Sequence, residues 1–378
     1  MRKIGTAQLQ FDPKLNRLGK GKEIRHGLSI VFQSGHSLWL ANDETISLER
    51  LTLRREGSEG GLRFGDHRQF ALSDYLKLPV PPPSDAEDIE EADVEGIAVS
   101  EGYLWLVGSH SLKRAKPRED DSARKGVKRL ATVSSDGNRF LLARIPVVDE
   151  ADGQTLAKEV EDEGGMRTAA LLHGDDTGND LTRALAQDPH LQAFLAIPGK
   201  DNGFDIEGLA IVGERVLLGL RGPVLRGWAV ILELLPKQVD GDPATLQLES
   251  LGPDKQPFLK HFLHLDGLGI RDLCVHGDDL LILAGPTMDL DGPVAIFRWL
   301  GGAHPAKNGL VLREACPSVG AVPFGQGADK GTDHAEGMCL CSADGWEGPA
   351  VLVVYDAASP SRLAHAKGAV SADIFALP

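Results

Sequence analysis

Short apolar runs, bounded by glycine and charged residues, recur in pairs along this chain. The clearest pair covers residues 205–211 and 215–223, with Gly213 and Glu214 at the junction between the two runs. Apolar runs of this length predict strands, and two of them joined across a tight turn predict an antiparallel hairpin. Four further pairs follow the same pattern and begin in residues 26–30, 94–99, 270–275 and 335–340. The pattern therefore indicates a fold built from internal repeats that each start with a hairpin.

One position within the repeat is marked by charge. A glutamate followed by glycine starts three of the repeats, at Glu95, Glu207 and Glu336, while His26 and Arg271 stand at the matching positions of two degenerate copies. Successive positions are about 65–70 residues apart, except between Glu95 and Glu207, where roughly 45 extra residues intervene. With that insertion set aside, the period is nearly constant along the chain.

Units of four short antiparallel strands, repeated around an axis, form a β-propeller. Closure of the ring removes the exposed sheet edges that would otherwise invite aggregation. We therefore predict an all-β fold, a single β-propeller domain over residues 1–378. Five blades is the favoured count, with six as the alternative if the insertion supplies a blade of its own. The blade repeats are expected to start near residues 26, 94, 206, 270 and 335.

Residues 149–200 depart from the repeat pattern. The segment starts acidic, and Leu181, Leu185 and Leu191 are then spaced so that they share one face of a helix. We predict a partly helical insertion on the scaffold. Just before it, residues 113–128 form a basic loop, and residues 129–134 are expected to be the third strand of the second repeat.

The two ends of the chain are predicted to complete one blade together. Too few residues follow the fifth repeat start for a full four-stranded blade, although residues 374–377 form a last apolar, strand-like run. A possible strand at residues 7–11 precedes the first repeat. Pairing of these two segments would close the ring.

Composition excludes several classes of partner. The chain has 55 acidic and 40 basic residues, a formal net charge of −15, which argues against nucleic acid because phosphate binding needs a basic face. Residues 1–9 lack the apolar core of a signal peptide, and no apolar run approaches the roughly 20 residues of a membrane helix. We expect free, buried thiols and a cytoplasmic protein from the four cysteines, Cys274, Cys316, Cys339 and Cys341.

The repeat sequences carry a family resemblance. Residues 205–210 together with 217–223, and residues 335–338, resemble the bacterial DUF3616 family. That family is uncharacterised and is similar to the propellers grouped with esterase-like phytases and SdiA-regulated proteins. The resemblance covers most of the chain, and its Leu-Arg-Gly-Pro element is the more specific part. It implies a propeller of bacterial source and no settled reaction.

The antiparallel geometry of the hairpins predicts where charged side chains gather. The start of the first strand of a blade and the end of its second strand lie on the same face of a propeller, because the two strands are antiparallel neighbours. The marked repeat positions and the ends of the second strands should therefore meet at one mouth of the central channel. The expected ligand-binding residues are Glu95, Glu207, Glu336, Arg221, Arg271, His26, Asp43 and His110.

Three converging glutamates allow two interpretations. Carboxylates in a narrow channel cannot all ionise without positive partners. Arg221 and Arg271 can supply that charge, and the glutamates would then brace neighbouring blades. Alternatively a hard divalent cation, Ca²⁺ or Mg²⁺, would bind to the carboxylate oxygens of Glu95, Glu207 and Glu336. One pairing scheme could serve both the structure and a site.

The sequence leaves two functions open. It contains no Gly-x-Ser-x-Gly elbow, no His-Glu-x-x-His helix, no Walker loop and no dinucleotide fingerprint. The favoured hypothesis is a binding or scaffold propeller that recognises a small polar ligand or a protein partner at the channel mouth. The alternative is a metal-assisted hydrolase or lactonase that uses Ca²⁺ or Mg²⁺ at the same mouth. Binding is favoured because His26 and Arg271 interrupt the column of carboxylates that a cation site would need.

Overall fold

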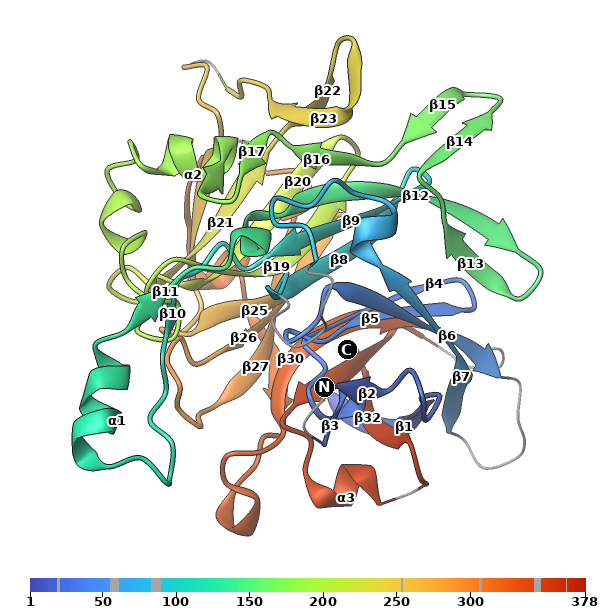
Figure 1. The fold of residues 1–378 in the computed structure, drawn as a ribbon, viewed down its shortest axis with the longest axis vertical. Helices are drawn as coiled ribbons and strands as arrows, with labels where there is room; N and C mark the ends of the chain where they lie inside the picture. The colour runs from blue at the N-terminus through green and yellow to red at the C-terminus, as the bar shows by residue number, and fades with distance from the viewer. Residues whose placement is uncertain are drawn as a thin grey trace.

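A computed structural model of the 378-residue chain defines the fold (Figure 1). It describes residues 1–18, 21–54, 61–82, 90–252, 254–305, 308–342, 348–364 and 366–378.

Four-stranded antiparallel units dominate the described part of the chain. The first two units follow one another along the sequence, and in each the first strand starts the hairpin predicted from the repeat. The first consists of β4 (Ile30–Ser34), β5 (Ser37–Ala41), β6 (Ser47–Arg54) and β7 (Leu62–Ala71). The second consists of β8 (Val94–Ser100), β9 (Tyr103–Gly108), β12 (Leu142–Glu150) and β16 (Ala170–Leu172).

The remaining units continue the same order. The third consists of β19 (Asp205–Val212), β20 (Arg215–Gly222), β21 (Trp228–Leu234) and β24 (Leu259–His264). The fourth consists of β25 (Gly269–His276), β26 (Asp279–Gly285), β27 (Val294–Trp299) and β29 (Ser318–Val322). The fifth takes strands from both ends of the chain: β30 (His334–Cys341), β31 (Ala350–Asp356), β32 (Ala369–Ala376) and β1 (Arg2–Gln10).

The first strands of the units form a closed ring. Strand β8 packs between β4 and β19, β25 packs between β19 and β30, and β30 returns to β4. Strand β1 pairs antiparallel with β32 and parallel with β7, so the first and last units are joined in one sheet. The two termini lie close together in Figure 1. The fold is therefore an all-β propeller, as the repeats predicted.

Apolar side chains fill the spaces between neighbouring units. One cluster joins the first unit to the second through Trp39 and Leu106, and another joins the third to the fourth through Ile231 and Ile282. Further clusters lie between the second and third, the fourth and fifth, and the fifth and first units. Strands inside a unit are covered on both faces, which explains why their sequences are continuous apolar runs rather than alternating ones.

Smaller elements decorate the units. Strands β22 (Pro236–Val239) and β23 (Asp242–Leu248) extend the second unit, β13 (Gly153–Leu156) pairs with β12, and β28 (Gly309–Val311) extends the third. Four two-stranded hairpins lie outside the units: β2 (Arg17–Leu18) with β3 (Lys22–Glu23), β10 (Lys113–Arg114) with β11 (Val133–Ser134), β14 (Glu159–Asp162) with β15 (Gly165–Thr168), and β17 (Gly174–Asp175) with β18 (Gly178–Asn179). The α-helices are α1 (Ala123–Leu130), α2 (Asp180–Leu185) and α3 (Pro360–Leu363).

The second unit differs from its expected strand assignment. Residues 129–134, expected to be its third strand, instead contain the end of α1 and the short strand β11, and the true third strand is β12. Six of the eight residues of α1 are good helix formers, and Ser122 caps it by accepting a hydrogen bond from the backbone N–H of Lys125. The fourth strand, β16, comes from the segment that was expected to be an insertion.

The helical pattern in that segment is present. Leu181 and Leu185 of α2, with Leu191 beyond it, are fully buried in the cluster between the second and third units. Asn179 caps α2 in a reciprocal arrangement with Thr182. Among the helices of the described chain, none is both long and apolar enough to cross a membrane.

Candidate functional site

The marked repeat position lies on a β-bulge in four of the first strands. The pairing register of each hairpin skips one residue, between Val94 and Gly96 in β8 and at the matching places in the other strands. A bulged residue has no partner across the hairpin, so its side chain can be aimed away from the sheet. The skipped residues are Glu95, Glu207, Arg271 and Glu336.

The glycine after each of the three glutamates has a packing reason. A Cβ on Gly96 would lie 2.4 Å from the Cβ of Leu209, on the first strand of the next unit. A Cβ on Gly208 would lie 2.9 Å from the Cγ of Leu273, and one on Gly337 would lie 2.8 Å from the Cα of Ile30. The Glu-Gly pair therefore combines a bulge that presents a carboxylate with a residue small enough for the next strand to approach.

Glu207 is held by two arginines. Its Oε1 accepts a hydrogen bond from Nη1 of Arg221 at 2.7 Å, and its Oε2 accepts one from Nη1 of Arg271 at 2.8 Å. All three side chains are buried. Burial alone would raise the pKa of Glu207, but the two guanidinium groups outweigh it and hold this pKa below its ordinary value. Glu207 is therefore an ionised brace between the third and fourth units.

Arg271 also reaches the fifth unit. The same Nη1 atom lies 3.1 Å from Oε1 of Glu336. Burial is the main cause that raises the pKa of Glu336 to about 7, with Arg271 opposing it and Asp356 adding to it. The pKa of Asp205, beside Glu207, is likewise raised to about 7, first by burial and then by the Glu207 charge. Two carboxyl groups at this mouth thus change charge near neutral pH.

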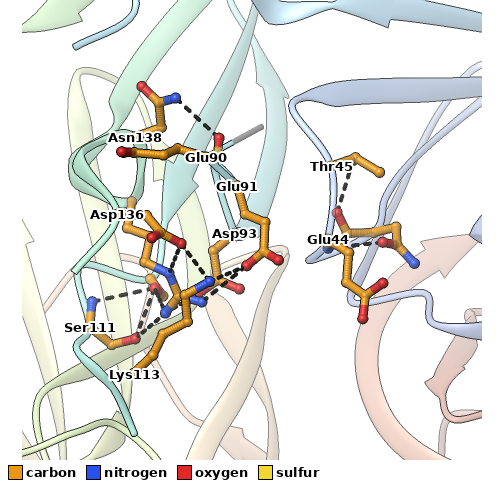
Figure 2. A network of polar contacts seen from close by, with 12 residues as sticks. Glu44, Thr45, Glu90, Glu91, Asp93, Ser111, Lys113, Asp136 and Asn138 are labelled. Atoms are coloured by element: carbon orange, nitrogen blue, oxygen red, sulfur yellow. Dashed lines mark hydrogen bonds and ion pairs between the residues drawn. The ribbon is translucent and has the colours of Figure 1, made fainter. Parts of the chain in front are cut away.

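A second charged network lies on the second unit, beside the channel mouth. Nη1 of Arg139 lies 2.8 Å from Oδ2 of Asp93 and donates a hydrogen bond to Oγ of Ser111 at 2.8 Å. In Figure 2, Lys113 reaches both Glu91 and Asp136, with which it forms ion pairs. This network fixes Asp93, which stands two residues before Glu95.

Glu95 and Asp43 differ from Glu207 in lacking a partner. Neither forms a hydrogen bond or an ion pair with any described residue, and both side chains are half-buried. Burial and then the neighbouring Asp93 raise the pKa of Glu95 well above its ordinary value. Burial and then Asp356 do the same for the pKa of Asp43. These two carboxyl groups have like charges around them and no matching cation within contact.

Lys200 and His334 supply the nearest further positive charge. Lys200 is exposed, and its ammonium group acts on Asp43, Glu336 and Asp356 without an ion pair to any described residue. His334 lies 3.2 Å from Oδ1 of Asp291 and 3.9 Å from Oδ2 of Asp356. A hydrogen bond to Asp356 is the main cause that raises the pKa of His334.

The structure brings six of the eight expected residues together: Glu95, Glu207, Glu336, Arg221, Arg271 and Asp43. The other two lie elsewhere. His26 precedes β4 in the 3₁₀ turn Ile24–His26, where its side chain is 41% exposed and its Nε2 lies 3.4 Å from Oε2 of Glu23. It is outside the first strand and therefore cannot occupy a bulge in it.

His110 faces the interior of the second unit. Its Nδ1 donates to the carbonyl oxygen of Gly108 at 2.8 Å, and its Nε2 accepts from Nδ2 of Asn179 at 2.8 Å. Burial lowers the pKa of His110 to about 4, so the ring is neutral at ordinary pH. A φ of 56° at His110 turns the chain after β9, and the ring serves as a structural link to the cap of α2.

Two charged residues of the site carried no repeat signal. Arg139 lies in the 3₁₀ turn Gly137–Phe140 before β12. Lys200 stands in the loop before β19, five positions ahead of Asp205. Only proximity to the marked glutamates in the folded chain reveals them. Across the described residues, no three His, Cys, Asp or Glu side chains are arranged to hold a metal ion.

Comparison with known proteins identifies a family. The family model for DUF3616, described as a protein of unknown function, matches residues 27–373. No curated protein sequence matches the chain significantly.

Solved structures give only distant likenesses. Glutaminyl cyclase from Myxococcus xanthus is 9% identical over 100% of both chains, with a TM-score of 0.37. A putative hydrolase from Bacteroides ovatus is 11% identical over 92% of this chain and 86% of its own, with a TM-score of 0.38. Hsv2 from Kluyveromyces lactis is 9% identical over 87% and 90%, with a TM-score of 0.28. Likenesses this low carry no argument about activity.

Proposed function

The chain belongs to DUF3616, a family of proteins of unknown function, and we propose that it is a binding propeller. Its ligand is a small polar molecule with a positively charged nitrogen, an ammonium or guanidinium group. The binding place is the mouth of the channel where the bulged carboxylates converge.

The observation that carries this proposal is the unequal pairing of equivalent carboxylates. Glu207 has two arginines, whereas Glu95, at the same repeat position, has no partner among the described residues. Asp43 adds a second unpaired carboxyl group, near enough for its charge to raise the pKa of Glu95. A cationic nitrogen bound between Glu95 and Asp43 would complete the charge balance with charge-assisted hydrogen bonds. Both side chains are half-buried, so a ligand can reach them from solvent.

Rigid surroundings support binding at this place. Arg221 and Arg271 both form ion pairs with Glu207, Arg271 also pairs with Glu336, and Arg139 pairs with Asp93. Their positions are set before any ligand arrives, which lowers the entropic cost of binding. Because a bound cation favours the ionised form of Glu95 and Asp43, binding at neutral pH releases protons.

Calorimetric titration with amines tests the proposal. The probes are ethanolamine, choline and agmatine, with ethylene glycol as the neutral analogue, each titrated at pH 7 in two buffers of different ionisation enthalpy. We expect binding of at least one amine with release of protons. Glu95→Gln should weaken binding at least tenfold, since losing a hydrogen bond to a charged group costs about 1.5–3 kcal/mol.

The matched control is Glu159→Gln, an exposed glutamate of β14 outside the site, which should bind as the unmodified chain does. Absence of amine binding, or equal binding by Glu95→Gln, would reject the proposal. Titration of CaCl₂ and MgCl₂ belongs to the same series. A response to those ions that Glu95→Gln and Glu207→Gln both remove would favour the metal-assisted alternative instead.

We also propose a cytoplasmic location. All four cysteines belong to the described part of the chain, and each is a free, buried thiol. Free thiols suit a reducing compartment. Partner proteins at the same mouth would have to present a lysine or arginine side chain to the Glu95 and Asp43 pair.

A further inference from the structure

A cavity of about 220 Å³ is lined by residues of all five first strands, β4, β8, β19, β25 and β30, beyond the channel mouth that holds the bulged carboxylates. Four of its lining residues occupy one repeat position, four residues after the bulge in each strand. They are Val99, Ile211, Val275 and Leu340, and Phe32 of β4 completes the group. In β8, β19, β25 and β30 the repeat thus places a charged residue at one end of the strand and an apolar residue toward the other. We call these five side chains the apolar ring.

No charged side chain lines this cavity. Its polar side chains are Ser100 and Gln33, together with two thiols. The amide nitrogen of Gln33 is already committed to the carbonyl oxygens of Gly35 and Ser342. Burial raises the pKa of the Cys274 thiol to about 12, and that of Cys339 is raised well above its ordinary value by burial and then by Cys341. Both thiols are therefore neutral at ordinary pH.

This chemistry suits an apolar occupant better than water. A buried water needs two to four hydrogen-bond partners, and cavities with apolar walls stay dry or take hydrocarbons; an engineered cavity of roughly 150 Å³ binds benzene. The cavity here is larger, so it has room for an aromatic ring with a short chain. All members of the apolar ring are half-buried, so an apolar ligand would remove exposed apolar surface from water.

From these observations we infer that the cavity is a second binding site, specific for a small uncharged apolar molecule. The inference does not depend on the proposed cation site. Its support is the repeated apolar position, the contribution of all five first strands, the uncharged lining and the volume. The ligand class is a hydrocarbon ring or short aliphatic chain without ionisable groups.

Thermal unfolding with n-butylbenzene as the probe tests this site. Saturating probe should raise the melting temperature by roughly 2–4 °C, because a ligand that binds only the folded state stabilises it. Val275→Trp, which fills the cavity, should abolish the rise. The matched control is Leu312→Trp, which adds the same group at a residue that is 57% exposed and does not line the cavity.

Further arms separate the alternatives. Should Val275→Trp fail to fold, Leu340→Phe serves as the smaller filling change. Glu95→Gln should keep the full response to n-butylbenzene, which distinguishes this site from the cation site. No rise with the unmodified chain, or an equal rise with both filling variants, would overturn the inference. So would self-association in light scattering that Val275→Trp abolishes, because the occupant would then be a second copy.

Discussion

Residues at one position of a repeat need not share one role. Glu95 and Glu207 stand on equivalent bulges, yet Glu207 is ionised between two arginines and Glu95 has no partner among the described residues. The neighbouring units cause this difference. Arg271 stands at the equivalent position of the fourth unit and forms an ion pair with Glu207 of the third unit. One arginine among the equivalent glutamates therefore leaves Glu207 paired and Glu95 unpaired.

Glu207→Gln should destabilise the protein. The substitution leaves Arg221 and Arg271 buried without their shared counter-ion, and breaking a buried pair in this way costs about 3–5 kcal/mol. Chemical denaturation measures the free energy of unfolding. Arg144→Gln, which removes a half-buried guanidinium outside the group, provides a comparison. An unchanged denaturation midpoint in Glu207→Gln would show that Glu207 does not brace the units.

Glu336→Gln should change how stability depends on pH. The folded-state pKa of Glu336 is about 7, above its ordinary value of 4.5, so its contribution is complete below pH 4.5 and is lost as the pH rises through 7. The free energy of unfolding of the variant should therefore fall less between pH 4.5 and 7 than that of the unmodified chain. Denaturation midpoints at several pH values measure it. A difference that stays constant with pH would contradict the assignment.

At the scale of elements, the bulge and the glycine that follows it explain the repeat motif. The bulge frees one side chain, and the missing Cβ lets the next first strand lie against it. The position of the Glu95 carboxylate depends on this packing, because a larger residue at Gly96 would push Leu209 of β19 away and move the bulge. The motif is thus a requirement of the ring as well as of the site.

Gly96→Ala should lower stability by about 1–3 kcal/mol, the usual cost of overpacking. The new Cβ would lie 2.4 Å from the Cβ of Leu209 and 2.8 Å from Cγ1 of Val107, and neither contact can be relieved without moving a strand. Gly126→Ala is the matched control. Its Cβ would lie 3.6 Å from Cβ of Pro117, an ordinary contact in α1, so it should be neutral or slightly stabilising. Equal melting temperatures for the two variants would reject the packing argument.

At the scale of the whole molecule, the last unit ties the two ends of the chain together. Asp373 of β32 accepts hydrogen bonds from the hydroxyl of Tyr355 at 2.9 Å and from Nη2 of Arg362 at 3.1 Å, and it pairs with Lys3 of β1 at 2.6 Å. One carboxylate therefore links β31, α3, β32 and β1. Arg362 also lies over the ring of Tyr355, 3.5 Å from its centroid.

Deletion of residues 369–378 should lower the melting temperature markedly. It removes β32, which separates β31 from β1, exposes the edges of both strands, and removes the buried side chains of Ile374 and Phe375. Replacing residues 118–130 by a short glycine-serine linker is the control, because α1 has no buried residue. Calorimetry compares the two deletions. A melting temperature close to that of the full chain after removal of 369–378 would contradict the closure argument.

Local patterns in the sequence were enough for the class of fold. The apolar residues of strands β21 and β27 form a nearly continuous run in the sequence, because side chains on both faces of these strands are buried. Residues 129–134 were assigned wrongly because a short amphipathic basic helix outside the core has no such run. The convergence of Glu95, Glu207 and Glu336 was likewise predictable, since it follows from the antiparallel hairpin and the repeat period.

Only the tertiary structure decided which carboxylates have partners. Arg139 and Lys200 reach the channel mouth from loops without any repeat signal, and His26 and His110 are held away from it by local contacts. Ion pairing depends on distances of a few ångströms between residues that are far apart in the chain, and the pKa of each group depends on its burial. Neither quantity exists until the ring has closed, so the sequence determined the position of the site while the folded structure determined its charge.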